Sequence, residues 1–204
     1  MPVIKTGLLC VPAYDETAVT AVRRLLARAA AGCIVVLEQS APMQRRVVEE
    51  LLRRWADEEE LDLVITLGGT LPAAGPSGRE IVPDATLSVA ERLLPGLAET
   101  MRTLAREQAP LALLDRSVAA IRGRTLLLNL PAGAAAALFL ENVLAAIPAA
   151  VALLQPEPPP LHLVAAEATL STPAAPPDAA PAAGKKPLDA AEFAAFLARK
   201  KPPE

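Results

Sequence analysis

Aromatic side chains make up only 2% of the 204 residues, although hydrophobic residues make up 52%. The core must therefore be built from aliphatic side chains. Proteins that bind single-stranded nucleic acids stack the bases on aromatic side chains, and nucleic-acid-binding surfaces in general are strongly basic. This chain lacks the aromatic residues and carries a net charge of −3. We therefore expect no nucleic acid partner.

Cysteine and histidine are also rare. Cys10 and Cys33 are the two cysteines, and His162 is the one histidine. Two thiols make a weak disulfide framework, and no acidic or cysteine partner stands at metal-ligand spacing from His162. The chain also opens without the basic segment of a secretory signal. We expect a cytoplasmic protein with both cysteines in its core and a solvated histidine.

A hydrophobic run long enough to cross a membrane is missing as well. Residues 130–154 come nearest, with Glu141 and Asn142 as their only polar side chains. These two residues, together with Pro131 and Pro148, divide the run into stretches shorter than the about 20 residues that a spanning helix needs. Two buried, Ala-rich helices are predicted instead, and no membrane partner.

The sequence does contain an alternation of strand and helix patterns. This alternation predicts a three-layer α/β/α sandwich with a mostly parallel sheet and one antiparallel pair, which a hairpin turn at 122–124 would join. The predicted strands are 3–11, 33–37, 61–67, 117–121 and 125–130. The predicted helices begin near Asp15 or Thr17, Pro42, Pro83, Leu97, Ala134 and Pro148, with Pro95-Gly96 breaking the helix from Pro83.

The composition changes at Gln155. Ten prolines are spread over residues 1–155, whereas eleven crowd into residues 156–204. Such a segment cannot bury enough apolar surface to offset its chain entropy. We predict a folded domain over 1–155 and a disordered Pro/Ala-rich tail over 156–204.

Residues 189–199 of this tail have the pattern of a short helix. Asp189 and Glu192 have capping-box spacing, and the apolar residues Phe193, Phe196 and Leu197 follow on one face. So short a helix is marginal alone. It either docks on a surface, of its own domain or of a partner, or is a fraying end without function.

The loop after the third predicted strand is the first candidate for a ligand site. Gly68, Gly69 and Thr70 follow this strand, and ligands of open α/β sheets bind at the carboxyl ends of the strands. Glycines let backbone N–H groups approach phosphate oxygens closely, although most such turns are merely structural. No Gly-Lys-Ser/Thr follows, which excludes a P-loop.

The stretches "DLVITLGGT", "PDATLSVAERLLPGLAETMR" and "IRGRTLLLNLPAG", in this order, resemble the molybdopterin adenylyltransferase (Mog/MoaB) family. The resemblance is strongest over residues 62–154. It implies a Mog/MoaB-like fold and a domain over 1–155 that binds molybdopterin, the phosphorylated dithiolene pterin of molybdenum cofactor. It also implies a homo-oligomer, a trimer. Some members are nucleotidyltransferases that transfer AMP from Mg-ATP to the phosphate of molybdopterin.

The resemblance also implies roles for individual residues. Asn129 would hydrogen-bond the pterin, whereas its residue type alone equally suits a turn or a helix cap. The Gly68–Thr70 loop would contact the phosphate end of the ligand. The implied substrate-binding residues are Gly68, Gly69, Thr70, Arg116, Asn129 and Pro131.

Three positions depart from the family pattern. Met43 and Glu80 stand where the family has catalytic Asp residues. Methionine does not bind Mg²⁺ and Glu does, so Glu80 is the predicted catalytic and metal-binding residue. The alternative is that Arg79 and Glu80 form an exposed pair of negligible energy. Asp115 replaces a common Ser and would repel a phosphate unless Arg116 neutralises it.

The resulting prediction is a molybdopterin-binding protein of molybdenum cofactor biosynthesis, which uses Mg²⁺ and ATP if it is catalytic. One alternative is a non-catalytic module that delivers the cofactor to a molybdoenzyme or a cofactor-pathway protein, with the tail as contact. Another is a nucleotide-phosphate hydrolase. The apolar residues of 130–154 exceed what one sheet face needs to bury, so we expect some of them between subunits.

Overall fold

The computed structural model describes residues 3–29, 32–72 and 80–158, all within one unit, Met1–Leu161. The tail beyond residue 158, with its predicted helix at 189–199 and His162, lies outside the described residues, as does Arg79.

The described residues form a six-stranded sheet with the order β2-β1-β3-β6-β5-β4. Its first four strands are parallel neighbours, and β5 runs antiparallel to both β6 and β4. The predicted hairpin is confirmed, since β5 and β6 are consecutive strands joined at residues 123–124. The strands are β1 (Ile4–Cys10), β2 (Cys33–Ser40), β3 (Leu63–Leu67), β4 (Arg92–Leu93), β5 (Ala119–Arg122) and β6 (Thr125–Leu130).

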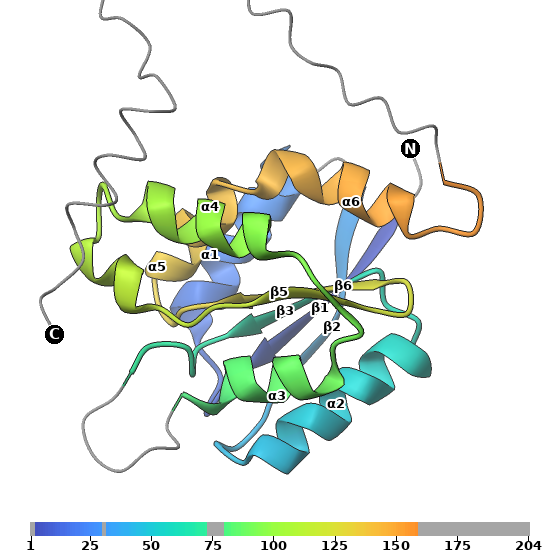
Figure 1. Cartoon of the computed structure of the whole chain (residues 1–204), viewed down its shortest axis with the longest axis horizontal. Coiled ribbons are helices and arrows are strands. Elements are labelled where there is room, and N and C mark those ends of the chain that lie inside the picture. Colours follow the sequence, from blue (N-terminus) through green and yellow to red (C-terminus); the bar gives the residue numbers. More distant parts are fainter. Residues whose placement is uncertain (1–2, 30–31, 73–79, 159–204) are drawn as a thin grey trace, which may run out of the picture. The chain divides into compact units, whose positions relative to one another are not determined.

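Helices cover both faces of this sheet, which confirms the predicted three-layer sandwich (Figure 1). One face carries α1 (Glu16–Ala29), α4 (Pro95–Ala105), α5 (Ala135–Glu141) and α6 (Ile147–Leu153), with the short 3₁₀ helices η1 (Pro110–Leu114) and η2 (Leu144–Ala146). The other face carries α2 (Arg45–Asp57) and α3 (Ile81–Val89).

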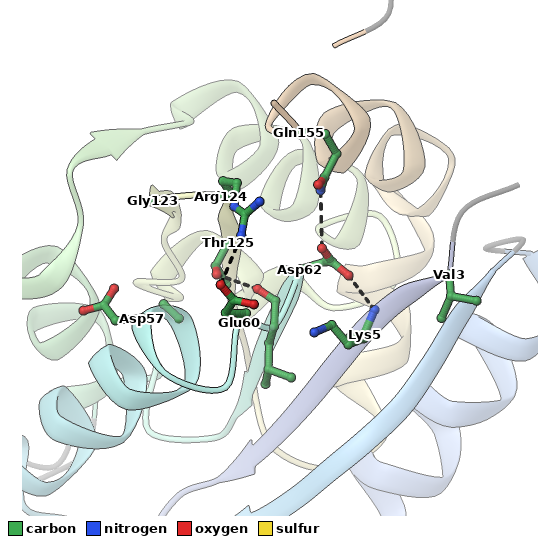
Figure 2. A pocket seen from close by; sticks show the side chains of 11 residues that line it. Val3, Lys5, Asp57, Glu60, Asp62, Gly123, Arg124, Thr125 and Gln155 are labelled. Atoms are coloured by element: carbon green, nitrogen blue, oxygen red, sulfur yellow. Dashed lines mark hydrogen bonds and ion pairs between the residues drawn. The ribbon is translucent and has the colours of Figure 1, made fainter. Parts of the chain in front are cut away.

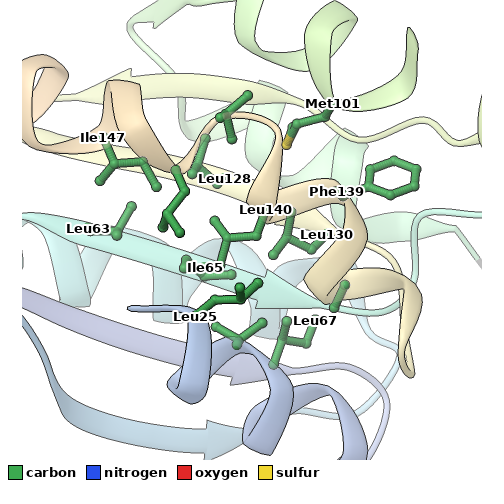
Figure 3. Close-up of a cluster of buried hydrophobic side chains, with 14 of the residues drawn as sticks. Leu25, Leu63, Ile65, Leu67, Met101, Leu128, Leu130, Phe139, Leu140 and Ile147 are labelled. Carbon is green, nitrogen blue, oxygen red and sulfur yellow. The ribbon is translucent and has the colours of Figure 1, made fainter. Parts of the chain in front are cut away.

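Both cores draw their side chains from the same central strands. Successive residues of a strand point to opposite faces, so Leu8 and Ile65 enter the core under α1 and α5, and Leu9 and Val64 enter the core under α2 and α3. Figure 3 shows how Ile65 and its neighbours on β3 and β6 meet the side chains of the covering helices. Strands buried on both faces are mostly apolar, and this is why the sequence made them easy to predict.

The second strand is an edge strand and less buried than expected. Ile34 and Val36 are each 49% exposed, and Cys33 is only partly buried. By contrast, Cys10 at the end of the central strand β1 is buried as predicted. Burial raises the pKa of both thiols, so both are protonated near neutral pH.

Residues 130–154 pack within the chain, and the expectation that they leave an excess of apolar surface is wrong. Phe139, Leu140 and Ile147 are buried in the core, and Leu153, at 38%, is the one exposed large apolar side chain of this stretch. Among the described residues, no single helix is long and apolar enough to cross a membrane. Only the bent pair Ala135–Glu141 and Leu144–Leu153 meets that test of length and composition, with 51° between its halves.

The structure decides which residue caps α1 and shifts the predicted break between α3 and α4. Asp15, not Thr17, caps α1, because its Oδ1 accepts the Ala18 N–H at 2.9 Å. The break between α3 and α4 comes earlier than predicted: α3 ends at Val89, and Pro95 begins α4. Proline suits a first helical turn, where its missing N–H would have no partner in the helix.

Candidate functional site

The candidate site lies at the edge of the sheet where β1, β3 and β6 end. These strands are parallel neighbours, so Cys10, Leu67 and Leu130 stand at the same edge. The chain passes from β1 to β2 on one side and returns to β3 on the other. Ligands of open α/β sheets bind at such a switch point, and the Gly68–Thr70 loop begins there.

The two glycines of this loop permit close packing of three chain segments. Gly68 has φ +95°, and a Cβ atom there would stand 2.3 Å from the carbonyl oxygen of Val11. Its N–H donates to the Leu130 carbonyl at 2.9 Å, so this N–H is already used. Gly69 has φ +64°, and a Cβ there would stand 2.8 Å from Val82 of α3. The loop is therefore clamped between the end of β1, the end of β6 and α3.

Thr70 is tied to Asp115, which lies far away in the sequence. The Thr70 hydroxyl donates to Asp115 Oδ2 at 2.6 Å, and the Ser117 N–H donates to Asp115 Oδ1 at 2.7 Å. Asp115 is 4% exposed. A buried carboxylate with a donor on each oxygen is a structural element of the turn. The sequence suggested that Arg116 would neutralise Asp115. In the structure the Thr70 hydroxyl and the Ser117 N–H stabilise this carboxylate instead.

Arg116 instead reaches across to the start of α3. Its Nη2 lies 2.7 Å from Asp84 Oδ1, and its Nη1 lies 3.6 Å from Glu80 Oε1 and 3.4 Å from the Glu80 carbonyl oxygen. The Arg116 backbone N–H donates to the Thr70 carbonyl at 3.1 Å. Of the predicted site residues, the structure thus brings Thr70, Glu80 and Arg116 together.

Asp84 is the member of this cluster that the sequence analysis did not identify. It belongs to the family-like stretch "PDAT" and stands four residues after Glu80. Glu80 directly precedes α3 and Asp84 lies in its first turn, so the sequence could have indicated two carboxylates at the start of this helix. The Arg116 guanidinium, which contacts both carboxylates, belongs to a residue 32 positions after Asp84 in the sequence.

Asn129 lies beneath the site and is completely buried, at 0% exposure. Its Nδ2 donates to the hydroxyls of Thr66 and Thr86 at 3.0 and 2.9 Å, and its Oδ1 accepts the Val118 N–H at 3.2 Å. Both amide hydrogens are used by these two bonds. In this structure Asn129 joins β6, β3, α3 and the residue before β5, and its enclosed side chain offers no free N–H to a ligand.

The loops after β1 and β6 are fastened to each other. Gly133 donates its N–H to Asp15 Oδ2 at 2.7 Å, while the other oxygen of Asp15 caps α1. Pro131, a predicted site residue, is buried at the start of the loop after β6. Pro131 therefore shapes this edge from within the structure.

Met43 is close to the loop. Its Sδ would lie 3.7 Å from a Cβ atom placed on Gly69. A thioether is a soft, weak ligand and does not replace a carboxylate toward Mg²⁺, which prefers oxygen. In the described part of the chain, no three His, Cys, Asp or Glu side chains are grouped to hold a metal ion.

A hollow of about 510 Å³ lies at the opposite end of the strands, among Lys5, Glu60, Asp62, Arg124 and Gln155 (Figure 2). Several of its polar groups already pair with one another. Asp62 accepts the Lys5 backbone N–H at 2.8 Å and a hydrogen bond from Gln155 Nε2 at 3.3 Å, and Arg124 pairs with Glu60 at 3.3 Å. The amino ends of parallel strands are also not where such sheets bind ligands. We therefore place the site at the carboxyl edge.

A family model described as "Probable molybdopterin binding domain" matches residues 9–148. This stretch contains five strands of the sheet and the end of β1, together with the whole carboxyl edge. Since the match covers most of the chain, the chain belongs to this family, as its motifs had indicated.

Individual relatives agree with this assignment. The chain is 44% identical over 90 residues to the molybdopterin adenylyltransferase of Haemophilus influenzae, and 36% identical over 118 residues to that of Escherichia coli. These alignments cover 44% and 58% of this chain, and the same shares of the two relatives. The chain thus matches about half the length of these curated relatives.

A crystal structure extends the likeness to the whole fold. The molybdopterin biosynthesis enzyme MoaB from Thermus thermophilus superposes with a TM-score of 0.67 at 37% identity. The superposition covers 76% of this chain and 98% of that one. The Mog/MoaB-like sandwich predicted from the sequence is therefore confirmed.

Proposed function

We propose that this chain binds molybdopterin at the carboxyl edge of its sheet and acts in molybdenum cofactor biosynthesis. The observation that carries the proposal is the cluster of Thr70, Glu80 and Arg116 at the switch point of the sheet. These residues lie within the region that matches the family model. The names of the adenylyltransferase and MoaB relatives support the choice of ligand.

In this proposal the residues of the edge divide into two groups. Gly69 and Arg116 meet the phosphate end of the ligand, because Arg116 supplies a positive charge beside a glycine-containing loop. Gly68, Thr70, Asn129 and Pro131 act as positioning residues, and the buried Thr70 hydroxyl is already bonded to Asp115. Asn129 belongs to this second group because its side chain is enclosed and already hydrogen-bonded.

Adenylyl transfer is the reaction that the relatives suggest. A phosphate oxygen of molybdopterin would attack the α-phosphorus of ATP, forming an O–P bond while the α–β anhydride bond breaks and pyrophosphate leaves. Mg²⁺ would neutralise charge on the phosphates, and it binds through a few carboxylates with phosphate oxygens and waters as further ligands. Glu80, the carboxylate beside Arg116, fits that limited demand.

Titration of the purified chain with molybdopterin tests the binding proposal. We expect saturable binding with a dissociation constant in the micromolar range or below. Isothermal titration calorimetry under anaerobic conditions measures it. Arg116→Gln should weaken the binding, whereas Arg124→Gln, at the opposite end of the strands, should not. If molybdopterin shows no saturable binding to the wild-type chain, the proposed function is wrong.

A non-catalytic binding or delivery module is the second candidate, and the position of Met43 favours it. This thioether lies next to Gly69, where the family pattern has a catalytic Asp. Pyrophosphate release with molybdopterin, Mg²⁺ and ATP separates the two candidates. Release supports the transferase, and tight pterin binding without release supports the module. ATP breakdown without the pterin would indicate a hydrolase.

We further propose a homo-oligomer, as the family resemblance suggests, with the trimer as the expected form. Support comes from η1, where Leu111, Leu113 and Leu114 are 69%, 55% and 58% exposed. Three large apolar side chains exposed within five residues are typical of a contact surface. Light scattering at micromolar concentration should give a multiple of the 21.3 kDa chain mass. A monomeric mass would refute this assembly.

A further inference from the structure

The backbone of Arg116 is fixed relative to the Gly68–Thr70 loop. Its N–H donates to the Thr70 carbonyl at 3.1 Å. The preceding residue, Asp115, is buried and binds the Thr70 hydroxyl and the Ser117 N–H. The root of the Arg116 side chain therefore cannot move independently of the loop.

The guanidinium end of Arg116 has one short and one long ionic contact. The distance from Nη2 to Asp84 Oδ1 is 2.7 Å, that of a charge-assisted hydrogen bond, whereas Nη1 lies 3.6 Å from Glu80 Oε1. Asp84 is thus the stronger holder. The side chains of Arg116 and Asp84 are each 40% exposed, so the guanidinium keeps an open side. A guanidinium has five N–H donors, and these contacts leave some of them free.

We propose that Asp84 is a positioning residue for anion recognition. It holds the Arg116 guanidinium beside the Gly69–Thr70 loop, and the free N–H groups then meet a phosphate group of the ligand. The inference rests on the proposed function and deepens it, since it identifies what orients the cation that binds the phosphate. Asp84 itself does not touch the ligand.

Two opposite effects of Asp84 have to be separated. Its negative charge weakens the attraction of the site for an anion, while its hydrogen bond orders Arg116 and strengthens binding. Asp84→Asn and Asp84→Ala both remove the charge, but only Asn keeps a side-chain oxygen for Nη2. The ratio of their affinities therefore measures positioning alone.

The experiment uses the full chain and inorganic pyrophosphate as the probe. NMR titration follows the backbone amide signals of Gly69 and Thr70, which every variant retains, and thermal unfolding shows that each variant is folded. We expect Asp84→Asn to bind pyrophosphate about fivefold more tightly than Asp84→Ala, the factor that corresponds to one hydrogen bond of about 1 kcal/mol.

Two controls show whether the effect passes through Arg116. In an Arg116→Lys background the ratio should fall below about twofold, because an ammonium lacks the planar fork that bridges Asp84 and a phosphate. Asp57→Ala removes the partner of Arg122, a comparable pair at the opposite end of the sheet. Its pyrophosphate affinity should stay within about twofold of the wild type.

Equal affinities of the folded Asn and Ala variants overturn the inference. The inference is also overturned if the affinity ratio persists in the Arg116→Lys background. It is overturned as well if the wild-type chain does not bind pyrophosphate. Molybdopterin titration of the wild-type chain remains a separate test. If the expected pyrophosphate ratio is found but molybdopterin does not bind, the proposed ligand is wrong and the role of Asp84 stands.

Discussion

The Thr70 hydroxyl donates a 2.6 Å hydrogen bond to Asp115 Oδ2, joining two loops that are 45 residues apart in the sequence. Both side chains are buried, at 1% and 4% exposure. The second oxygen of Asp115 accepts the Ser117 N–H. A carboxylate that seemed to oppose phosphate binding thus serves to hold the turn that carries Arg116.

Thr70→Val tests this bond, because valine keeps the shape and removes the hydroxyl. Asp115 Oδ2 then loses its donor inside the protein, so the free energy of unfolding should fall by about 1–3 kcal/mol. Urea denaturation measures the change. Thr103→Val, at an exposed position of α4, is the control and should stay within about 0.5 kcal/mol of the wild type. Equal stability of the two variants would remove the structural role of the bond.

Asn129→Leu should be among the most destabilising substitutions at the site. It leaves the hydroxyls of Thr66 and Thr86 and the Val118 N–H without the partners they have now. We expect a loss of about 3 kcal/mol or more, measured by chemical denaturation.

Asn142→Leu is a matched control for this substitution. Its Nδ2 is buried and has no hydrogen-bond partner in the described structure. Replacing it with leucine therefore breaks no bond, and the change should stay within about 1 kcal/mol. If Asn129→Leu were equally mild, the network around Asn129 would not contribute to stability.

Gly68→Ala combines two costs. The backbone at φ +95° is unfavourable for alanine, and the new Cβ would stand 2.3 Å from the Val11 carbonyl oxygen. We expect a loss of about 3 kcal/mol or more, with weaker binding of molybdopterin. Gly123→Ala has only the first cost, since φ is +54° and no atom lies within 4 Å of its Cβ. It should lose about 1 kcal/mol. Differential scanning calorimetry compares them.

Glu80→Gln tests the proposed catalytic role. The substitution keeps the size of the side chain and removes the charge that would bind Mg²⁺. If the chain is an adenylyltransferase, pyrophosphate release should fall by at least about a hundredfold with an unchanged melting temperature. Glu58→Gln, at the exposed end of α2, is the control and should retain full activity. Unchanged turnover of the Glu80 variant would end this assignment.

The acid stability of the chain should depend partly on Glu49. The hydrogen bond from Arg45 Nε, at 2.6 Å, is the main cause that lowers the pKa of this carboxyl below its ordinary 4.5, and a bond from Ser88 adds to it. Because the folded-state pKa is the lower one, the stabilisation is present above pH 4.5 and is lost as pH falls through the folded pKa. When the pH is lowered from about 7 to about 3, the melting temperature should therefore fall less steeply for Glu49→Gln than for the wild type. Parallel curves would contradict this prediction.

Much of the fold could be predicted from the sequence, because local patterns report local structure. The run Thr125–Leu130 could be predicted as a buried strand, because four of its six residues are leucines and a strand covered on both faces is mostly apolar. The candidate site loop could also be located, because Gly68 and Gly69 follow a buried strand. Open α/β sheets bind ligands at the carboxyl ends of their strands. The family-like motifs then indicated the kind of ligand.

The tertiary structure alone decided which side chains meet and which are exposed. Arg116 pairs with Asp84, 32 residues away, and not with its neighbour Asp115. The apolar helices of 130–154 are enclosed by the core, whereas β2 lies at an edge with Ile34 and Val36 half exposed. The spacing of apolar residues along a sequence indicates whether one segment is a helix or a strand. Contacts between distant segments depend on strand order and on the paths of the loops, which no single segment encodes.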